Sequence, residues 1–110
     1  MNVEEAKVMF IAQGRASPFG LWEIAKVVKE DMGIQDPSEV IEKSLEIVRS
    51  LLKSGLRAGE SLYVSGNGFV PWPEENIESI VVHIKYEWEK FGKEPNILDS
   101  PWFGSTSAVR

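Results

Sequence analysis

The segment that most constrains the fold runs from Glu46 to Glu60, where an amphipathic helix ends at a glycine and passes directly into extended chain. Asp36 can cap the first turn of this helix, and Pro37 suits its first helical position. Gly55 is predicted to close it, because glycine readily takes the left-handed conformation that ends many helices. The chain must therefore place a short extended segment directly after the end of this helix.

Apolar residues recur at helical spacing in three other stretches, each bounded by residues typical of helix ends. The expected helices run from about residue 2 to 12, from 18 to 32 and from 73 to 91, besides the one over 37–54. The second is expected to start at Ser17–Pro18, with the proline at its first helical position. The second and third helices, joined by a short turn, form a helix-turn-helix by their spacing.

Short strands are predicted after the third helix, where the period of apolar residues changes. Leu62–Val64 and Phe69–Val70 flank Gly66-Asn-Gly68, and Asn-Gly is a strong hairpin signal. Pro101–Phe103 is expected to form a last short strand, and residues 104–110 are expected to fray.

Length and composition indicate one globular domain over residues 1–110, with a core over about 2–103. The chain is 43% hydrophobic and 26% charged, an ordinary globular composition. It has no cysteine, which excludes disulfides and thiolate metal ligands. No apolar stretch approaches the ~18 residues of a membrane span, and Met1–Glu5 does not resemble the start of a signal peptide. We therefore expect a cytoplasmic protein that does not bind membranes.

Several short motifs follow one another in an informative order. They are Leu21-Trp-Glu-Ile24, Leu51-Leu-Lys-Ser-Gly-Leu56, Phe69-Val-Pro-Trp72, Trp88 with Gly92 and Pro95, and Trp102-Phe103. Over residues 19–107 this order resembles a family of small bacterial winged-helix-like proteins. The resemblance implies a helix-turn-helix core whose wing carries an inserted helix, here residues 73–91, and it supplies no activity and no catalytic residues. The predicted fold class is thus α+β and mostly helical: a winged-helix-like three-helix core, a small antiparallel sheet and an additional C-terminal amphipathic helix.

A helix-turn-helix suggests DNA binding, but the charge pattern argues against that function. The chain carries 17 acidic and 12 basic side chains, a net charge of −5, which repels the phosphate backbone. The first turn of the third helix, which would meet the bases, holds Asp36 and Glu39. A winged-helix transcription regulator is therefore the alternative function. Its candidate DNA-binding residues are Lys43, Arg49, Lys53 and Arg57.

Acidic charge and four tryptophans favour a protein partner instead. Trp22 lies beside the apolar stripe of its helix, and Trp72 stands between two prolines, although packing in or near the core would also account for each. The acidic pairs Glu4–Glu5, Glu30–Asp31 and Glu74–Glu75 suit a solvated surface or, more specifically, a patch for a basic partner. We expect a non-enzymatic protein-binding module. Its candidate contact residues are Trp22, Trp72, Glu74, Glu75 and Glu78.

One concrete version of this function is an immunity protein. Small acidic proteins of this general size resemble the immunity proteins encoded beside bacterial contact-dependent toxins. That looser resemblance implies an inhibitor of a toxic nuclease, which would be basic, with the acidic surface taking the place of the nucleic acid.

Enzyme chemistry has little support in the sequence. His83 is the only histidine, and Glu87 follows it at helical spacing, so a general-base pair is the sharpest hypothesis. An ordinary helix-surface pair explains it better, since no nucleophile is apparent nearby. Ser65-Gly-Asn-Gly68 lacks the lysine of a phosphate loop, and a hairpin turn accounts for it. We expect no enzyme activity, no cofactor and no metal.

Overall fold

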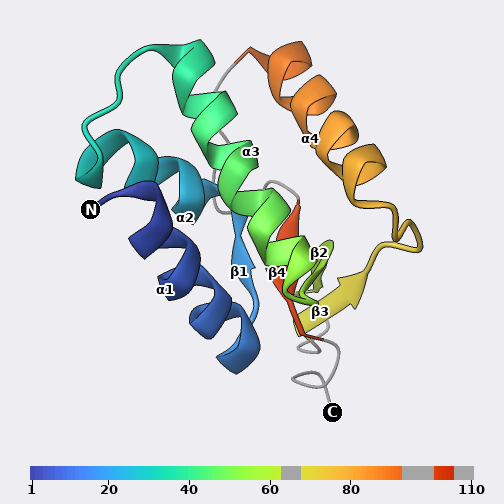
Figure 1. The fold of residues 1–110 in the computed structure, drawn as a ribbon. Helices are drawn as coiled ribbons and strands as arrows, with labels where there is room; N and C mark the ends of the chain where they lie inside the picture. Colours follow the sequence, from blue (N-terminus) through green and yellow to red (C-terminus); the bar gives the residue numbers. More distant parts are fainter. Residues whose placement is uncertain (63–67, 93–100, 106–110) are drawn as a thin grey trace.

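The computed structural model describes residues 1–62, 68–92 and 101–105, and its fold is α+β and mostly helical, as predicted. In chain order the elements are α1 (Val3–Ala16), β1 (Phe19–Gly20), α2 (Leu21–Lys26), the π-helical η1 (Val27–Asp31), α3 (Pro37–Lys53), β2 (Arg57–Leu62), β3 (Gly68–Pro71), α4 (Ile77–Phe91) and β4 (Trp102–Gly104). Helix α3 runs through the middle of the molecule, with α1 on one side and α4 on the other (Figure 1). None of the helices in the described ranges is long and apolar enough to cross a membrane.

The strands form one antiparallel sheet in the order β1-β4-β2-β3. The last strand in the sequence thus lies between the first and the second: Trp102 is opposite Gly20 on one side, and Phe103 is opposite Ala58 on the other. Strands β2 and β4 are neighbours in the sheet, although β3 and α4 lie between them in the sequence. The predicted additional helix is α4, in this connection.

One hydrophobic cluster joins the helices to the sheet. Its aromatic centre comes from α1, β1 and β4: the rings of Phe10 and Phe19 are stacked with centroids 5.1 Å apart, and Phe103 lies 5.8 Å from Phe19. Both long helices contribute the apolar stripes that the sequence predicted. The buried residues are Val40, Leu45, Ile47, Val48, Leu51 and Leu52 from α3, and Ile80, Val81, Ile84 and Trp88 from α4.

Two predicted helix boundaries near the N-terminus are wrong. Helix α1 continues past Ala12 to Ala16, with Gly14 buried inside it. A Cβ atom at Gly14 would lie 2.6 Å from Leu56 Cδ1, so the glycine serves close packing and does not end the helix. The second helix begins at Leu21 and not at Ser17–Pro18, because the preceding residues pair with β4 as strand β1.

The later boundaries also shift. Helix α4 begins at Ile77, four residues after Pro73, because the side chain of Asn76 accepts a hydrogen bond from the Ser79 amide and caps it there. Extended chain follows the end of α3 directly, as predicted, but strand β2 begins at Arg57, five residues before the expected start at Leu62. Gly104, expected to fray, pairs with Arg57 in the sheet. The predictions for residues 63–67, 93–100 and 106–110 lie outside the described residues.

Candidate functional site

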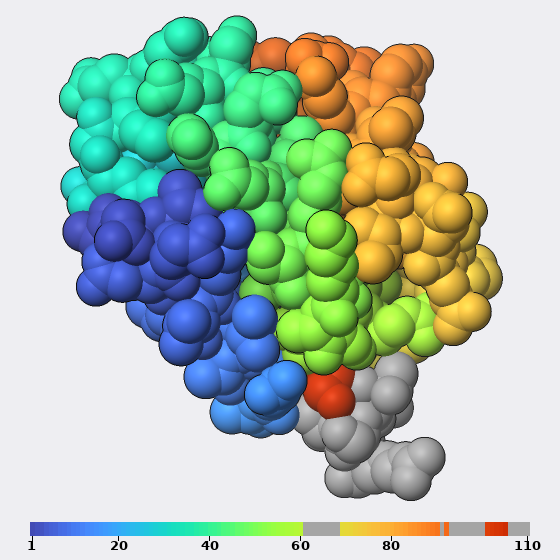
Figure 2. Space-filling model, viewed as in Figure 1, coloured from blue at the N-terminus to red at the C-terminus, as the bar shows by residue number. Residues whose placement is uncertain are grey.

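The two predicted sets of contact residues meet at the seam between α3 and α4, which lie side by side on the face shown in Figure 2. Arg49 of α3 donates hydrogen bonds to Glu78 of α4, and the two shortest are Nε to Oε2 at 3.1 Å and Nη2 to Oε1 at 3.2 Å. The geometry is the bidentate fork that arginine and carboxylate favour. A residue predicted to bind DNA is therefore engaged by a residue predicted to bind a basic protein.

A second pair of the same kind lies at the start of β2. Arg57 Nη1 lies 3.5 Å from Glu75 Oε1, and its Nη2 donates to the carbonyl oxygen of Trp72 at 2.7 Å. Elsewhere in the two sets, Glu74 accepts a hydrogen bond from the Asn76 amide, and Lys43 lies 3.9 Å from Glu46. Much of the predicted acidic patch thus serves to neutralise the predicted basic patch.

The opposite edge of α3 is ion-paired to α1. Lys7 Nζ lies 3.1 Å from Glu4 on its own helix and 3.4 Å from Glu46 on α3. The hydrogen bond to Glu4 raises the pKa of Lys7, and the contact with Glu46 adds to this rise, which exceeds the lowering by burial. The amine therefore stays charged between the two carboxylates.

All three polar groups of Trp72 form hydrogen bonds. Its amide donates to Ala58, its carbonyl accepts from Arg57, and its indole Nε1 donates to Glu60 Oε2 at 2.7 Å. The ring is half-buried against the core and meets the His83 ring edge-on, with centroids 5.2 Å apart. The structure thus uses Trp72 to fasten the end of β3 to β2.

Trp22, the other candidate tryptophan, differs from Trp72 in its polar contacts. Its indole Nε1 is buried without a hydrogen-bond partner. The ring packs against Gly20, where a Cβ atom would lie 2.6 Å from Trp22 Cδ1. Unlike the Trp72 indole, the Trp22 indole gains nothing from its N–H group.

This contrast predicts effects of different size for two matched substitutions. Trp72→Phe removes a hydrogen bond to a carboxylate and should lower the free energy of unfolding by about 1.5 kcal/mol. Trp22→Phe should change it by less than about 1 kcal/mol, because the lost ring contacts are offset by removing a buried, unsatisfied donor. Urea unfolding followed by circular dichroism would check both. Equal losses for the two variants would contradict the assigned hydrogen bonding.

The hypothetical general-base pair, His83 and Glu87, lies on α4. His83 is exposed on α4, and its ring contact is with Trp72 and not with Glu87. Among the described residues, no cluster of three or more histidine, aspartate or glutamate side chains is placed to hold a metal ion.

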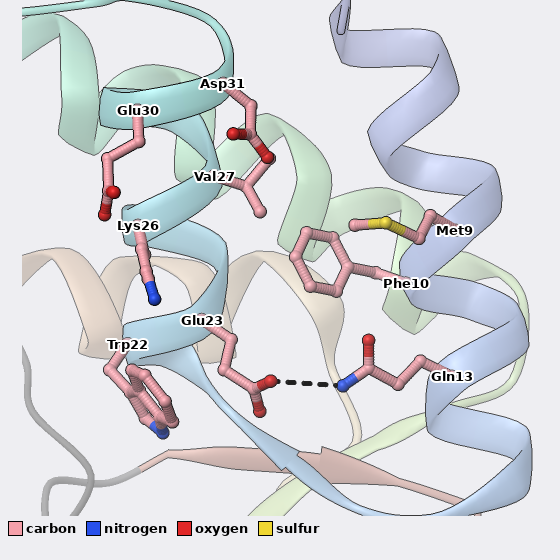
Figure 3. A pocket seen from close by; sticks show the side chains of 9 residues that line it. All are labelled: Met9, Phe10, Gln13, Trp22, Glu23, Lys26, Val27, Glu30 and Asp31. Carbon is pink, nitrogen blue, oxygen red and sulfur yellow. Dashed lines mark hydrogen bonds between the residues drawn. The ribbon is translucent and has the colours of Figure 1, made fainter.

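A groove of about 350 Å³ lies between α1 and the continuous helix formed by α2 and η1 (Figure 3). It is lined by Met9, Phe10 and Gln13 of α1 and by Trp22, Glu23, Lys26, Val27, Glu30 and Asp31 of α2 and η1. This lining contains three carboxylates and one ammonium group, while the centre between the helices is apolar. The groove thus brings together Trp22, a predicted contact residue, and carboxylates that take no part in the ion pairs between α3 and the α4 region.

The groove has two rows of side chains at helical spacing, as Figure 3 shows. Glu23, Val27 and Asp31 follow one another along the edge that faces α1. At the lower end, Glu23 is fixed by the amide of Gln13 at 3.2 Å. Glu23 also accepts a hydrogen bond from the Gly20 amide at 3.4 Å. At the upper end, Asp31 is exposed.

The second row consists of Trp22, Lys26 and Glu30 and lies next to the first. Trp22 is half-buried, whereas Lys26 and Glu30 are exposed. A ligand in the groove would therefore meet an aromatic surface at one end and free carboxylates at the other.

Sequence reasoning singled out Trp22 and the Glu30–Asp31 pair but missed Gln13, Glu23 and Lys26 as members of one site. The repeat of side chains four residues apart over 22–31 was a usable signal. The contribution of α1 could not be predicted, because the groove exists only where α1 packs beside α2.

Comparison of the chain with known protein families, with curated proteins and with solved structures finds no match.

Proposed function

We propose that this chain is a non-enzymatic protein-binding module for a basic partner and that the partner binds over the groove between α1 and α2. The observation that carries the proposal is the combination of half-buried Trp22 with the exposed carboxylates of Glu30 and Asp31 in one concave site. Aromatic anchors beside charged groups are typical of protein interfaces. The net charge of −5 would accelerate the approach of a basic partner.

The groove supports this function better than the acidic residues near the start of α4. Glu75 and Glu78 already bind Arg57 and Arg49, so a partner would have to compete with these pairs. Glu30 and Asp31 are exposed at the rim of the groove. A partner can therefore pair with them without breaking an ion pair of the seam.

Two double variants with the same change in charge test this assignment. Glu30→Gln with Asp31→Asn removes the groove carboxylates, and Glu75→Gln with Glu78→Gln removes those of the seam. We expect a basic protein captured by the wild-type chain to bind the groove variant about tenfold more weakly and the seam variant within about threefold of wild type. Calorimetry with the purified partner measures both. Equal weakening by the two variants would contradict the groove as the contact surface.

An immunity protein that inhibits a basic bacterial toxin in the cytoplasm is the concrete form of this proposal. The acidic groove would then take up basic side chains that otherwise contact the toxin's nucleic-acid substrate. Inhibition of the captured partner's nuclease activity at equimolar protein is the expected result, and loss of inhibition in the groove variant would link it to the site.

A DNA-binding regulator is the second candidate, and the succession of α2, a short turn, α3 and β2 favours it. Its basic residues Arg49 and Arg57 are held by carboxylates of the α4 region, which stand where phosphates would have to bind. If this ion pairing is what prevents DNA binding, the seam variant should bind duplex DNA at least about tenfold more tightly than wild type at low salt, and added salt should abolish the gain. Fluorescence anisotropy measures this. Tight, salt-sensitive DNA binding by the wild-type chain would instead make the regulator the better proposal.

A further inference from the structure

We propose that the groove between α1 and α2 is a receptor for an arginine side chain of the basic protein partner. This inference rests on the proposed function and adds the chemical group that the groove recognises. An arginine side chain joins an apolar stem to a planar cation, and the groove offers an apolar centre followed by carboxylates at its upper rim.

The apolar part of the groove fits the stem of such a side chain. Phe10 is buried and forms the floor, while Met9 and Val27 are half-buried and form the walls. From Glu23 to Asp31 the helix rises roughly 12 Å, which exceeds the length of one extended arginine side chain. The methylene groups can thus lie over these three residues while the guanidinium reaches a polar end.

The charged part favours a cation of this shape. Carboxylates bind guanidinium through paired hydrogen bonds, and the planar group also stacks on an indole ring. At the upper end of the groove, Glu30 and Asp31 offer carboxylates to the guanidinium, whereas Trp22 at the other end offers its ring to a neighbouring arginine of the partner. An ammonium group would use only the charge, because it has neither the fork nor the flat face.

The position of the two carboxylates at a helix end adds to their attraction for a cation. Glu30 and Asp31 are the last residues of the helix that α2 and η1 form together. The negative end of a helix dipole disfavours acidic side chains, so they reduce the stability of the free protein. The Met1 ammonium, which donates to the Asp31 carbonyl oxygen at 3.4 Å, offsets part of this repulsion, and a bound cation would offset more of it. The π-helical turns of η1, a form often found at functional sites, carry both residues.

Lys26 sets the strength of the site. It lies between Trp22 and Glu30 in the outer row, where its ammonium group would repel an incoming guanidinium (Figure 3). Removing this charge should strengthen the binding of an arginine, whereas removing Glu30 and Asp31 should weaken it. Two changes in one groove thus have effects of opposite sign.

The test is a titration of the full chain, labelled with nitrogen-15, with an acetylated and amidated hexa-arginine peptide, followed by residue-resolved NMR. We expect the amides of Val27–Asp31 and the Trp22 indole to shift together to saturation. A hexa-lysine peptide of equal charge should bind at least about threefold more weakly. Equal affinity for the two peptides, or shifts spread evenly over the acidic surface, would overturn the arginine receptor.

The variants sharpen this result. Hexa-arginine should bind Glu30→Gln/Asp31→Asn about tenfold more weakly, Lys26→Gln about threefold more tightly, and the matched control Glu75→Gln/Glu78→Gln within about twofold of wild type. The melting temperature of the groove variant should rise by roughly 3 °C, because its helix end loses a repulsion. Weaker binding together with a lower melting temperature would indicate a general structural defect and would overturn the proposal.

The peptide experiment separates this inference from the proposed function. If the peptide occupies the groove but no basic protein binds there, the proposed function fails, and only the affinity of the groove for arginine side chains is supported. If a basic protein binds in a groove-dependent way but the peptides do not discriminate, the function stands and the arginine site fails.

Discussion

Replacing Phe103 by alanine is expected to lower the free energy of unfolding by about 3–5 kcal/mol. Phe103 is fully buried in β4, an inner strand of the sheet, and its ring lies 5.8 Å from that of Phe19. The substitution leaves a cavity where α1, β1 and β2 converge, and rigid strands on both sides of β4 restrict how far the structure can collapse into it. Urea unfolding followed by tryptophan fluorescence and by circular dichroism measures the loss.

The matched control is Phe103→Leu, which keeps most of the apolar volume and should cost only about 1.5 kcal/mol. A small domain has a total stability of about 5–15 kcal/mol, so the alanine variant is expected to be partly unfolded at 37 °C while the leucine variant stays folded. If alanine cost no more than leucine, β4 would not be an essential part of the core.

The second large effect is expected at Gly59. A Cβ atom there would collide with the carbonyl oxygen of Val70 and lie 2.7 Å from Pro71 Cα, both atoms of the neighbouring β3 backbone. Gly59 pairs with Pro71 on one side and with Trp102 on the other, so it cannot move away from β3 without disturbing β4. Gly59→Ala should therefore lower the free energy of unfolding by about 3 kcal/mol, as measured by urea unfolding.

Gly14→Ala is the control for this prediction. Its added Cβ would meet the end of the Leu56 side chain at 2.6 Å, and a side-chain end can shift more easily than backbone. The alanine also gains about 1 kcal/mol of helix propensity inside α1. We expect a net change smaller than about 1.5 kcal/mol, and a loss as large as that of Gly59→Ala would show that α1 is packed as rigidly as the sheet.

The helices were predictable from sequence because their signals are local. The cap at Asp36, the proline at its first position and the spacing of Leu45, Val48 and Leu52 identify α3 almost to the residue. The predictions failed at Ser17–Pro18 and at Ala12, where a proline and a glycine suggested a boundary. There, pairing with β4 and contact with Leu56, both distant in sequence, outweighed the local preference.

The candidate site was likewise predictable only in part. Sequence showed that Glu75 and Glu78 are acidic and that Arg49 and Arg57 are basic. It could not show that they pair, because Arg49 and Glu78 are 29 residues apart and meet only when α4 packs beside α3. An ion pair neutralises both partners at once, so this packing contact reduces the charge available at both the predicted acidic patch and the predicted basic patch.

Local patterns were sufficient to predict the α+β class, the amphipathic helices and the strand that follows α3, since hydrophobic period and capping act over a few residues. Contacts between distant segments place β4 inside the sheet, join the Trp72 indole to Glu60, and bring Trp22, Glu30 and Asp31 into the lining of one groove. These features depend on which surfaces come into contact, and such contacts are fixed by burial of the whole apolar cluster and not by any short stretch of chain.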